Sequence, residues 1–170
     1  MKKIGVGLLA GLILSAGVGV FTASKSDNDV LRETRDRADI EDLMWRYTRA
    51  LDTSDGDAYA ATYTTDGQFG AGANATKGRE ALKKLAGGQR AATPPANAEK
   101  RPPMYHMTAN QRVTFSDKDH ARVEAYYITA MAAGGENQPL RVAAVGRSID
   151  DVVRVNGQWL IKSRNVAPTD

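Results

Sequence analysis

The chain has 170 residues, a formal charge of +3 and no cysteine. This length supports one domain with a hydrophobic core, and the lack of cysteine excludes disulfides, thiolate metal sites and cysteine nucleophiles. The charge falls to near +1 when Lys2 and Lys3 are set aside with the N-terminal segment. No basic stripe remains, so we expect no nucleic-acid partner.

Residues 1–24 differ in composition from the rest of the chain. Two lysines precede an apolar run from Ile4 to about Phe21, and small residues follow it, which is the pattern of a secretory signal. An uncleaved membrane anchor is the alternative, because about 18 apolar residues can just span a bilayer. Either alternative predicts a domain outside the cytoplasm, periplasmic or secreted in the first case and held at the membrane in the second.

The charged residues 25–38 are predicted to form a leader, as a solvated spacer or as the first turns of a helix. We assign the domain itself to residues 39–167. An amphipathic helix begins near Asp39, with a buried face that repeats at helical spacing. The residues of that face are Ile40, Leu43, Met44, Tyr47 and Leu51.

The remaining elements follow in order. The stretch TSDGD at 53–57 ends the first helix, DAYAATYT begins a second, and KGREALKKLAGG predicts a third after the turn at Asp66-Gly67. Four prolines across residues 94–103 exclude a regular element there. Four alternating segments then predict an antiparallel meander over residues 104–115, 121–131, 140–155 and 158–166. Helices followed by strands make the fold class α+β, with a curved sheet around the long helix.

The two histidines have different settings. His120 lies in SDKDHARV, a charged hairpin, and is expected to be a solvated turn residue. His106 lies on a strand whose alternate positions 106, 108, 110, 112 and 114 are polar, whereas positions 105, 107, 109, 113 and 115 are apolar. If the apolar set packs in the core, His106 faces water; if the sheet curls into a cone, the polar set, Asn110 included, lines a cavity. The sequence leaves both alternatives open.

Tyr47 and Asp52 also have ordinary explanations. Tyr47 fits a core tyrosine whose hydroxyl finds a partner, and Asp52 fits a helix end, although an acid there is mildly unfavourable. Their spacing sets the two side chains about 140° apart on an ideal helix. A shared site would therefore require the last helical turn to unwind.

Arg164 and Tyr127 are further candidates on the predicted strands. Arg164 suits either an anionic substrate group or an ion pair with Asp150 or Asp151, and Tyr127 suits either a pocket wall or the core. The acids near residue 55 lack calcium-loop spacing, and neither a nucleophile elbow nor a phosphate-binding glycine loop is present. We therefore predict no metal and no cofactor.

Four segments together resemble the SnoaL-like families of the nuclear transport factor 2-like superfamily, over about residues 36–166. They are ADIEDLMWRYTRALDTSDGDAYAATYTTDGQF, KGREAL, YHMTANQRVTF and AVGRSIDDVVRVNGQWLIKSR. The resemblance implies a cone-shaped α+β barrel, with N-terminal helices packed on a strongly curved, mainly antiparallel sheet that encloses a pocket. In the branch with scytalone dehydratase and bile-acid 7α-dehydratase, a tyrosine, an aspartate and a histidine converge, which by motif are Tyr47, Asp52 and His106. Scytalone dehydratase has a second pocket histidine that this chain lacks.

The resemblance and the residues together predict an exported, cofactor-independent lyase or isomerase, dehydratase-like, acting on a small carbonyl compound. The predicted catalytic residues are Tyr47, Asp52 and His106, and the predicted substrate-binding residues are Tyr127, Asn110 and Arg164. The alternative is a non-catalytic module that binds a small ligand or dimerises, since fold does not fix function. A homodimer is expected in either case, and membrane contact only through an uncleaved N-terminal segment.

Overall fold

The computed structural model describes residues 25–88, 104–132 and 139–169. The predicted signal or anchor segment 1–24 and the proline-rich stretch 94–103 lie outside these ranges. Within them, no helix combines the length and the apolar character that a membrane crossing needs.

Helix α1, Asp27–Thr53, is the longest helix described. Ser26 caps its start by accepting a hydrogen bond from the backbone N–H of Asp29, and Ser54 ends it in a left-handed conformation, with φ of 56°. Residues of the predicted charged leader thus form the cap and first turns of this helix. The predicted apolar face is confirmed: Ile40, Leu43, Met44, Tyr47 and Leu51 are all buried.

Short elements follow α1 and close one end of the fold. They are α2 (Gly56–Ala61), β1 (Tyr63–Phe69), the 3-10 turn η1 (Gly72–Asn74), β2 (Thr76–Lys77) and α3 (Arg79–Gly88). Helices α2 and α3 approach closely at Gly56, where an added Cβ would lie 2.4 Å from the backbone oxygen of Lys83. Only glycine fits between these two backbones.

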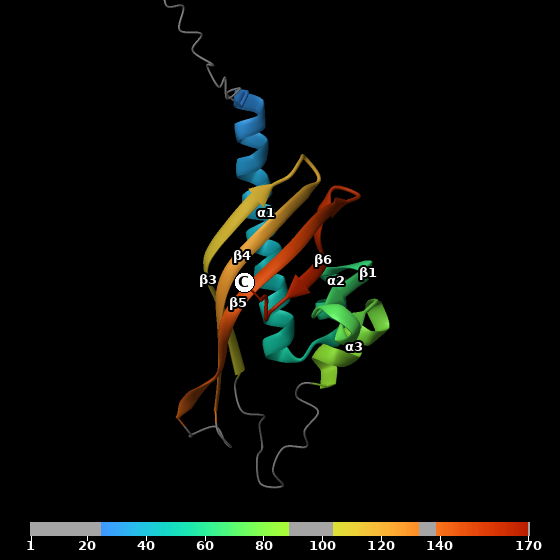
Figure 1. Ribbon diagram of the computed structural model, residues 1–170, viewed down its shortest axis with the longest axis vertical. Helices are drawn as coiled ribbons and strands as arrows, with labels where there is room; N and C mark the ends of the chain where they lie inside the picture. Colours follow the sequence, from blue (N-terminus) through green and yellow to red (C-terminus); the bar gives the residue numbers. More distant parts are fainter. Residues whose placement is uncertain (1–24, 89–103, 133–138, 170) are drawn as a thin grey trace, which may run out of the picture.

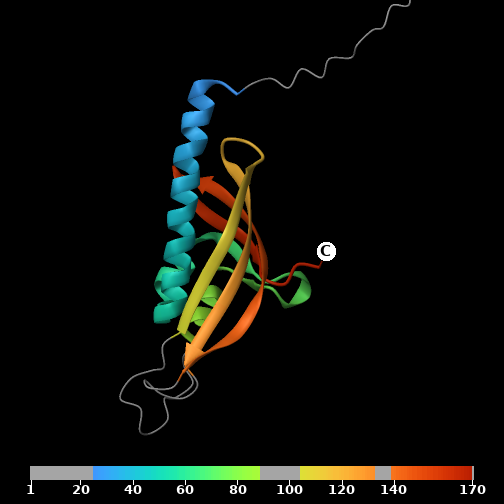
Figure 2. The ribbon, with the colours of Figure 1, turned by 90° about the vertical axis from the view of Figure 1, so that its left-hand side faces the viewer.

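The sheet has six strands in the order β2-β1-β6-β5-β4-β3, with β1 parallel to β6 and the other neighbours antiparallel. Its long strands are β3 (Met104–Phe115), β4 (His120–Ala132), β5 (Leu140–Val155) and β6 (Gln158–Asn165). The curved sheet has α1 packed along one face, and α2 and α3 beside β1 (Figures 1 and 2). The predicted α+β class and the meander are confirmed.

A bulge in β3 decides which way its side chains face. The pairing of β3 with β4 shifts register between Ala109 and Arg112, and Asn110 has a positive φ of 53°. Asparagine tolerates this left-handed conformation better than other residues with a side chain. A bulge inserts extra residues into one strand, so the alternation of inward and outward positions changes across it.

Both faces proposed from the sequence consequently turn inward, one on each side of the bulge. Before it, His106 and Thr108 are half-buried, whereas Tyr105 is exposed. Beyond it, Val113 and Phe115 pack against the hydrophobic core. Beyond the bulge, inward residues of β3 therefore add to the hydrophobic core, whereas before it they bring a histidine and a threonine to the inner face.

Candidate functional site

Asp52 and His106 lie in contact, although 54 residues separate them along the chain. Asp52 stands in the last turn of α1, and its Oδ1 accepts hydrogen bonds from the His106 backbone N–H and lies against the His106 Nδ1, each at 2.9 Å. The side chains are 9% and 18% exposed, and Arg49 lies 3.9 Å from the other Asp52 oxygen. This contact joins the end of α1 to β3.

The contact fixes the protonation pattern of the imidazole. An ionised carboxylate only accepts hydrogen bonds, so Nδ1 of His106 must carry the proton that it shares with Asp52. In the neutral ring, Nε2 is then the acceptor. An acid behind an imidazole orients the ring and stabilises its charged form.

A cavity of about 190 Å³, here called the inner cavity, lies beside His106. His106, Tyr47, Tyr127 and Arg164 all line it, so the structure brings four of the six predicted site residues to one hollow. Asp52 joins them through His106. The expected unwinding does not occur, because Asp52 remains helical and acts from behind the imidazole instead of facing the cavity.

Tyr47 is buried in a cluster of rings. Tyr59 and Tyr63 lie 5.3 and 6.3 Å away between ring centroids, and the Arg164 guanidinium lies 4.3 Å from the centroid of the Tyr47 ring. Burial raises the pKa of the Tyr47 hydroxyl above its usual value, against the opposing charge of Arg164. The hydroxyl therefore stays protonated, which suits a hydrogen-bond donor and not a base.

Arg164 forms a buried ion pair with Asp150. Of the two alternatives from the sequence, the ion pair with Asp150 is the one present, and it offsets the charge of the guanidinium. Burial raises the pKa of Asp150 to about 6, although Arg164 opposes the shift. The pair thus supplies a neutralised polar wall behind Tyr47.

Of the other two predicted substrate-binding residues, Tyr127 lines the inner cavity and Asn110 does not. Tyr127 lines the inner cavity and donates a hydrogen bond to the backbone oxygen of Val166, 3.1 Å away. Its ring covers Gly146, where an added Cβ would meet the Tyr127 hydroxyl at 2.8 Å. Asn110 stands apart from the inner cavity, at the bulge, and borders a separate hollow beside Tyr126. The sequence pattern predicted no bulge there, although the preference of asparagine for left-handed backbone could have suggested one.

Thr48 and Thr108 are site residues that sequence reasoning did not single out. Both line the inner cavity together with His106. Thr48 follows Met44 by four residues and so shares the buried face of α1, where its hydroxyl bonds to the Trp45 oxygen at 3.0 Å. Thr108 shares the inward alternation of His106. Helical and strand periodicity were the signals that could have found them.

The second histidine behaves as predicted. His120 Nδ1 lies 2.9 Å from Asp117 Oδ1 at the β3–β4 turn, and the two side chains are 59% and 56% exposed. Among the residues that the structure describes, no group of three histidine, aspartate or glutamate side chains is placed to hold a metal ion.

Comparisons with solved structures find the same fold. An NTF2-like protein with a cystatin-like fold from Novosphingobium aromaticivorans is 23% identical, with 84% of this chain and 88% of that chain covered and a TM-score of 0.68. Another protein from this organism, provisionally named a scytalone dehydratase, is 23% identical over 83% and 89% of the chains, with a TM-score of 0.66. A Catenulispora acidiphila protein in complex with S-DNPA is 22% identical over 77% and 91%, with a TM-score of 0.63.

No curated protein matches the sequence significantly. The family model of the SnoaL-like domain matches residues 32–165, most of the chain. This match extends from the first third of α1 to the end of β6, and it includes all the residues of the inner cavity named above except Val166. The chain therefore belongs to the SnoaL-like domain family, with the NTF2-like fold.

Proposed function

We propose that the protein is a cofactor-independent lyase or isomerase, dehydratase-like in its chemistry, that acts on a small carbonyl compound. The observation that carries the proposal is the 2.9 Å contact between His106 Nδ1 and Asp52 Oδ1, behind a cavity that Tyr47 also lines. An imidazole with Nε2 ready to accept a proton, in one cavity with a protonated phenol, suits acid–base chemistry at carbon.

In the first step, His106 Nε2 removes a proton from the carbon next to the substrate carbonyl. The electron pair of that C–H bond forms an enolate, and the enolate oxygen accepts a hydrogen bond from the Tyr47 hydroxyl. Asp52 stabilises the resulting imidazolium, because its carboxylate accepts the Nδ1–H.

In the second step, the enolate electrons form a carbon–carbon double bond as the bond to a hydroxyl group on the next carbon breaks. The His106 imidazolium gives its proton to that hydroxyl, which leaves as water. The products are an α,β-unsaturated carbonyl compound and water. In an isomerase, the same proton returns to a different carbon and no group leaves.

The magnitudes suit a slow reaction on an activated substrate. General acid–base assistance contributes typically about 10²- to 10⁴-fold, and one oriented donor to an oxyanion contributes about 10²- to 10³-fold. These factors support elimination or isomerisation next to a carbonyl. They do not support the hydrolysis of an unactivated bond.

The competing function is a non-catalytic module that binds a small ligand. One observation favours it: Asp52 also holds the backbone N–H of His106, so the contact has a structural value that needs no chemistry. A small cavity with a single histidine would serve such a module equally well.

Deuterium exchange separates the two functions. The protein is incubated in deuterium oxide with small β-hydroxy ketones such as 4-hydroxy-2-butanone, and α-carbon exchange and water loss are followed by proton NMR. An enzyme accelerates both above buffer, and Asp52→Asn slows them at least 100-fold while the protein stays folded, because asparagine still offers an oxygen to the His106 backbone N–H. Equal rates for wild type, Asp52→Asn and buffer would support the module.

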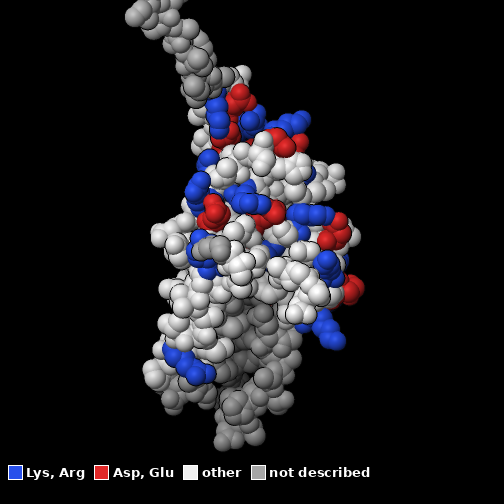
Figure 3. Space-filling model, in the orientation of Figure 1, with Lys and Arg blue, Asp and Glu red and all other residues white. Residues whose placement is uncertain are grey.

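The outer face of the sheet supports the proposal of a homodimer. Met107, Ile128 and Val145 are directly paired neighbours across β3, β4 and β5, and all three are exposed. In the view of Figure 3, most charged side chains lie in the upper half, toward the start of α1, and at the right-hand edge, whereas much of the lower face is uncharged apart from a basic group at the lower left. An apolar row of this kind is self-complementary across a two-fold axis. Ile128→Lys should convert a dimer into a monomer in sedimentation velocity, and an unchanged mass would contradict it.

We also propose that the domain works outside the cytoplasm. The support is the lysine-led apolar pattern of residues 1–24. Intact-mass analysis of the protein from fractionated cells tests this. A periplasmic or secreted species lacking that segment, or a full-length species in the membrane fraction, fits the proposal. A full-length cytoplasmic species would contradict it.

A further inference from the structure

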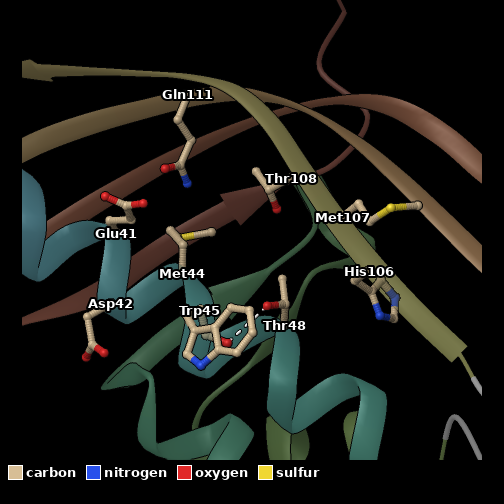
Figure 4. Close-up of a pocket in the computed structure, with 9 residues that line it drawn as sticks. All are labelled: Glu41, Asp42, Met44, Trp45, Thr48, His106, Met107, Thr108 and Gln111. Carbon is tan, nitrogen blue, oxygen red and sulfur yellow. Dashed lines mark hydrogen bonds between the residues drawn. The ribbon is translucent and has the colours of Figure 1, made fainter.

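A second hollow lies outside the inner cavity, between α1 and β3, with a volume of about 430 Å³. We call it the lateral groove. Figure 4 shows Glu41, Trp45 and Thr48 on α1 across from His106 and the other lining residues of β3. The volume falls within the 300–1,000 Å³ that is roughly typical of ligand sites, whereas the inner cavity is smaller.

The groove and the inner cavity share a wall. Thr48, His106 and Thr108 line both hollows. A molecule in the groove would therefore lie against the same imidazole that Asp52 orients. The groove is placed to hold one part of a ligand whose other part reaches His106.

Trp45 gives the groove an aromatic side. Trp45 is 64% exposed, although it is next in the chain to the buried Met44, which also lines the groove. A large aromatic side chain exposed at a concave surface offers its face to a ligand. An indole face attracts cations more strongly than the faces of other aromatic residues.

The charged side chains of the groove are acidic. Glu41 and Asp42 line it, and no lysine or arginine is among the lining residues that the structure describes. Arg46 compensates Asp42 through an ion pair at 2.9 Å. Glu41 has no ion pair within the described part of the chain, so its carboxylate remains available in the groove, one helical turn before Trp45.

We propose that the lateral groove binds an organic cation: an ammonium group on an apolar stem, held between the Trp45 indole and the Glu41 carboxylate. The proposal rests on the proposed function in one respect, because it makes this cation the remote part of the substrate whose carbonyl end meets His106. Cation binding itself can be measured without turnover.

The test uses benzyltrimethylammonium as the probe, with benzyl alcohol as the neutral analogue and benzenesulfonate as the anionic one. Tryptophan fluorescence reports occupancy, since Trp45 is exposed and Trp159, the other tryptophan, is buried. The cation should quench the emission at lower concentration than either analogue. Added salt should weaken the effect, because the groove is open to water.

Two variants assign the charge effect. Glu41→Gln should weaken binding of the cation about three- to tenfold, the range expected for a partly exposed carboxylate and cation. Asp39→Asn is the matched control: it removes one exposed charge from α1 about 200° around the helix from Glu41, and it should leave binding unchanged.

The outcomes separate this inference from the proposed catalysis. Equal binding of cation and neutral analogue, or unchanged affinity in Glu41→Gln, overturns the groove proposal even if deuterium exchange is catalysed. Cation binding that depends on Glu41, without any exchange, supports the groove as a ligand site and removes only the catalytic proposal.

Discussion

The molecule contains two histidine–aspartate contacts of the same length in different surroundings. In each, an aspartate Oδ1 lies 2.9 Å from a histidine Nδ1. His106 and Asp52 join α1 to β3 at the wall of a cavity, whereas His120 and Asp117 lie three residues apart on an exposed turn. Contact geometry alone therefore does not define a site. Burial and neighbouring groups distinguish the two contacts.

Solvent explains the difference in physical terms. An exposed ion pair is screened by water and gains little free energy, whereas the same contact away from water is electrostatically stronger. The exposed contact also stabilises the turn between β3 and β4. A hydrogen bond from the Asp119 backbone N–H, and to a smaller extent one with the His120 side chain, lowers the pKa of Asp117 below its usual value. The half-buried contact instead connects distant elements, and its histidine lines the inner cavity together with Tyr47.

Among the groups around the two contacts, the Tyr47 hydroxyl should give the largest effect when it is removed. Tyr47→Phe deletes the hydroxyl but keeps the ring under Arg164, so deuterium exchange should slow about 10²- to 10³-fold with little loss of stability. Tyr126→Phe, at an exposed tyrosine, is the control and should exchange like wild type. An unchanged rate in Tyr47→Phe would show that the phenol does not act on the substrate.

Removing each aspartate compares the two contacts by stability. Asp52→Ala leaves the His106 backbone N–H and ring N–H without their acceptor, and should lower the free energy of unfolding by about 2–4 kcal/mol. Asp117→Ala should cost only a small fraction of that, since water replaces the carboxylate. Urea denaturation measures both. Equal losses would mean that the buried contact gains nothing from its surroundings.

The wall of the inner cavity can be altered without touching either aspartate. Gly146→Ala places a Cβ 2.8–2.9 Å from the Tyr127 ring and hydroxyl, so Tyr127 must move, and we expect a loss of about 1–3 kcal/mol. Gly87→Ala on α3 meets no atom of the described residues within 4 Å and should be neutral or slightly stabilising. Thermal unfolding of the two variants checks the difference, and a neutral Gly146→Ala would contradict the close packing of Tyr127.

The smallest expected effect is a contrast in titration. Burial raises the pKa of Asp150 to about 6, so its contribution to stability is complete below its ordinary pKa and is lost as pH rises through about 6. Asp117 has a lowered pKa, so its contribution is present above its ordinary pKa and is lost as pH falls. Carboxyl ¹³C shifts report both, and an Asp150 that titrates near 4 or below would contradict the effect of burial.

The predicted helix face and the meander followed from periodicity, because both elements bury one side in a regular pattern. The direction of His106 did not follow, because the bulge at Asn110 inverts the alternation halfway along β3. The contact of His106 with Asp52 was reached only through the family resemblance. No local pattern connects residues 54 positions apart.

The lateral groove shows the same limit. Glu41 and Trp45 are four residues apart, so the sequence alone predicts that they share one face of a helix. Their placement opposite β3 depends on how the sheet curls around α1, and that curvature is a tertiary property. Helical periodicity predicts which residues share a face but not what lies across from that face.

The proposed reaction makes His106 the proton carrier and gives the exposed His120 no role beyond its turn. The most direct test is the deuterium-exchange rate of two matched variants, His106→Gln and His120→Gln. The exchange rate of His106→Gln should fall to the rate in buffer, whereas His120→Gln should keep the wild-type rate. Exchange that survives in His106→Gln, or falls equally in both variants, would contradict it.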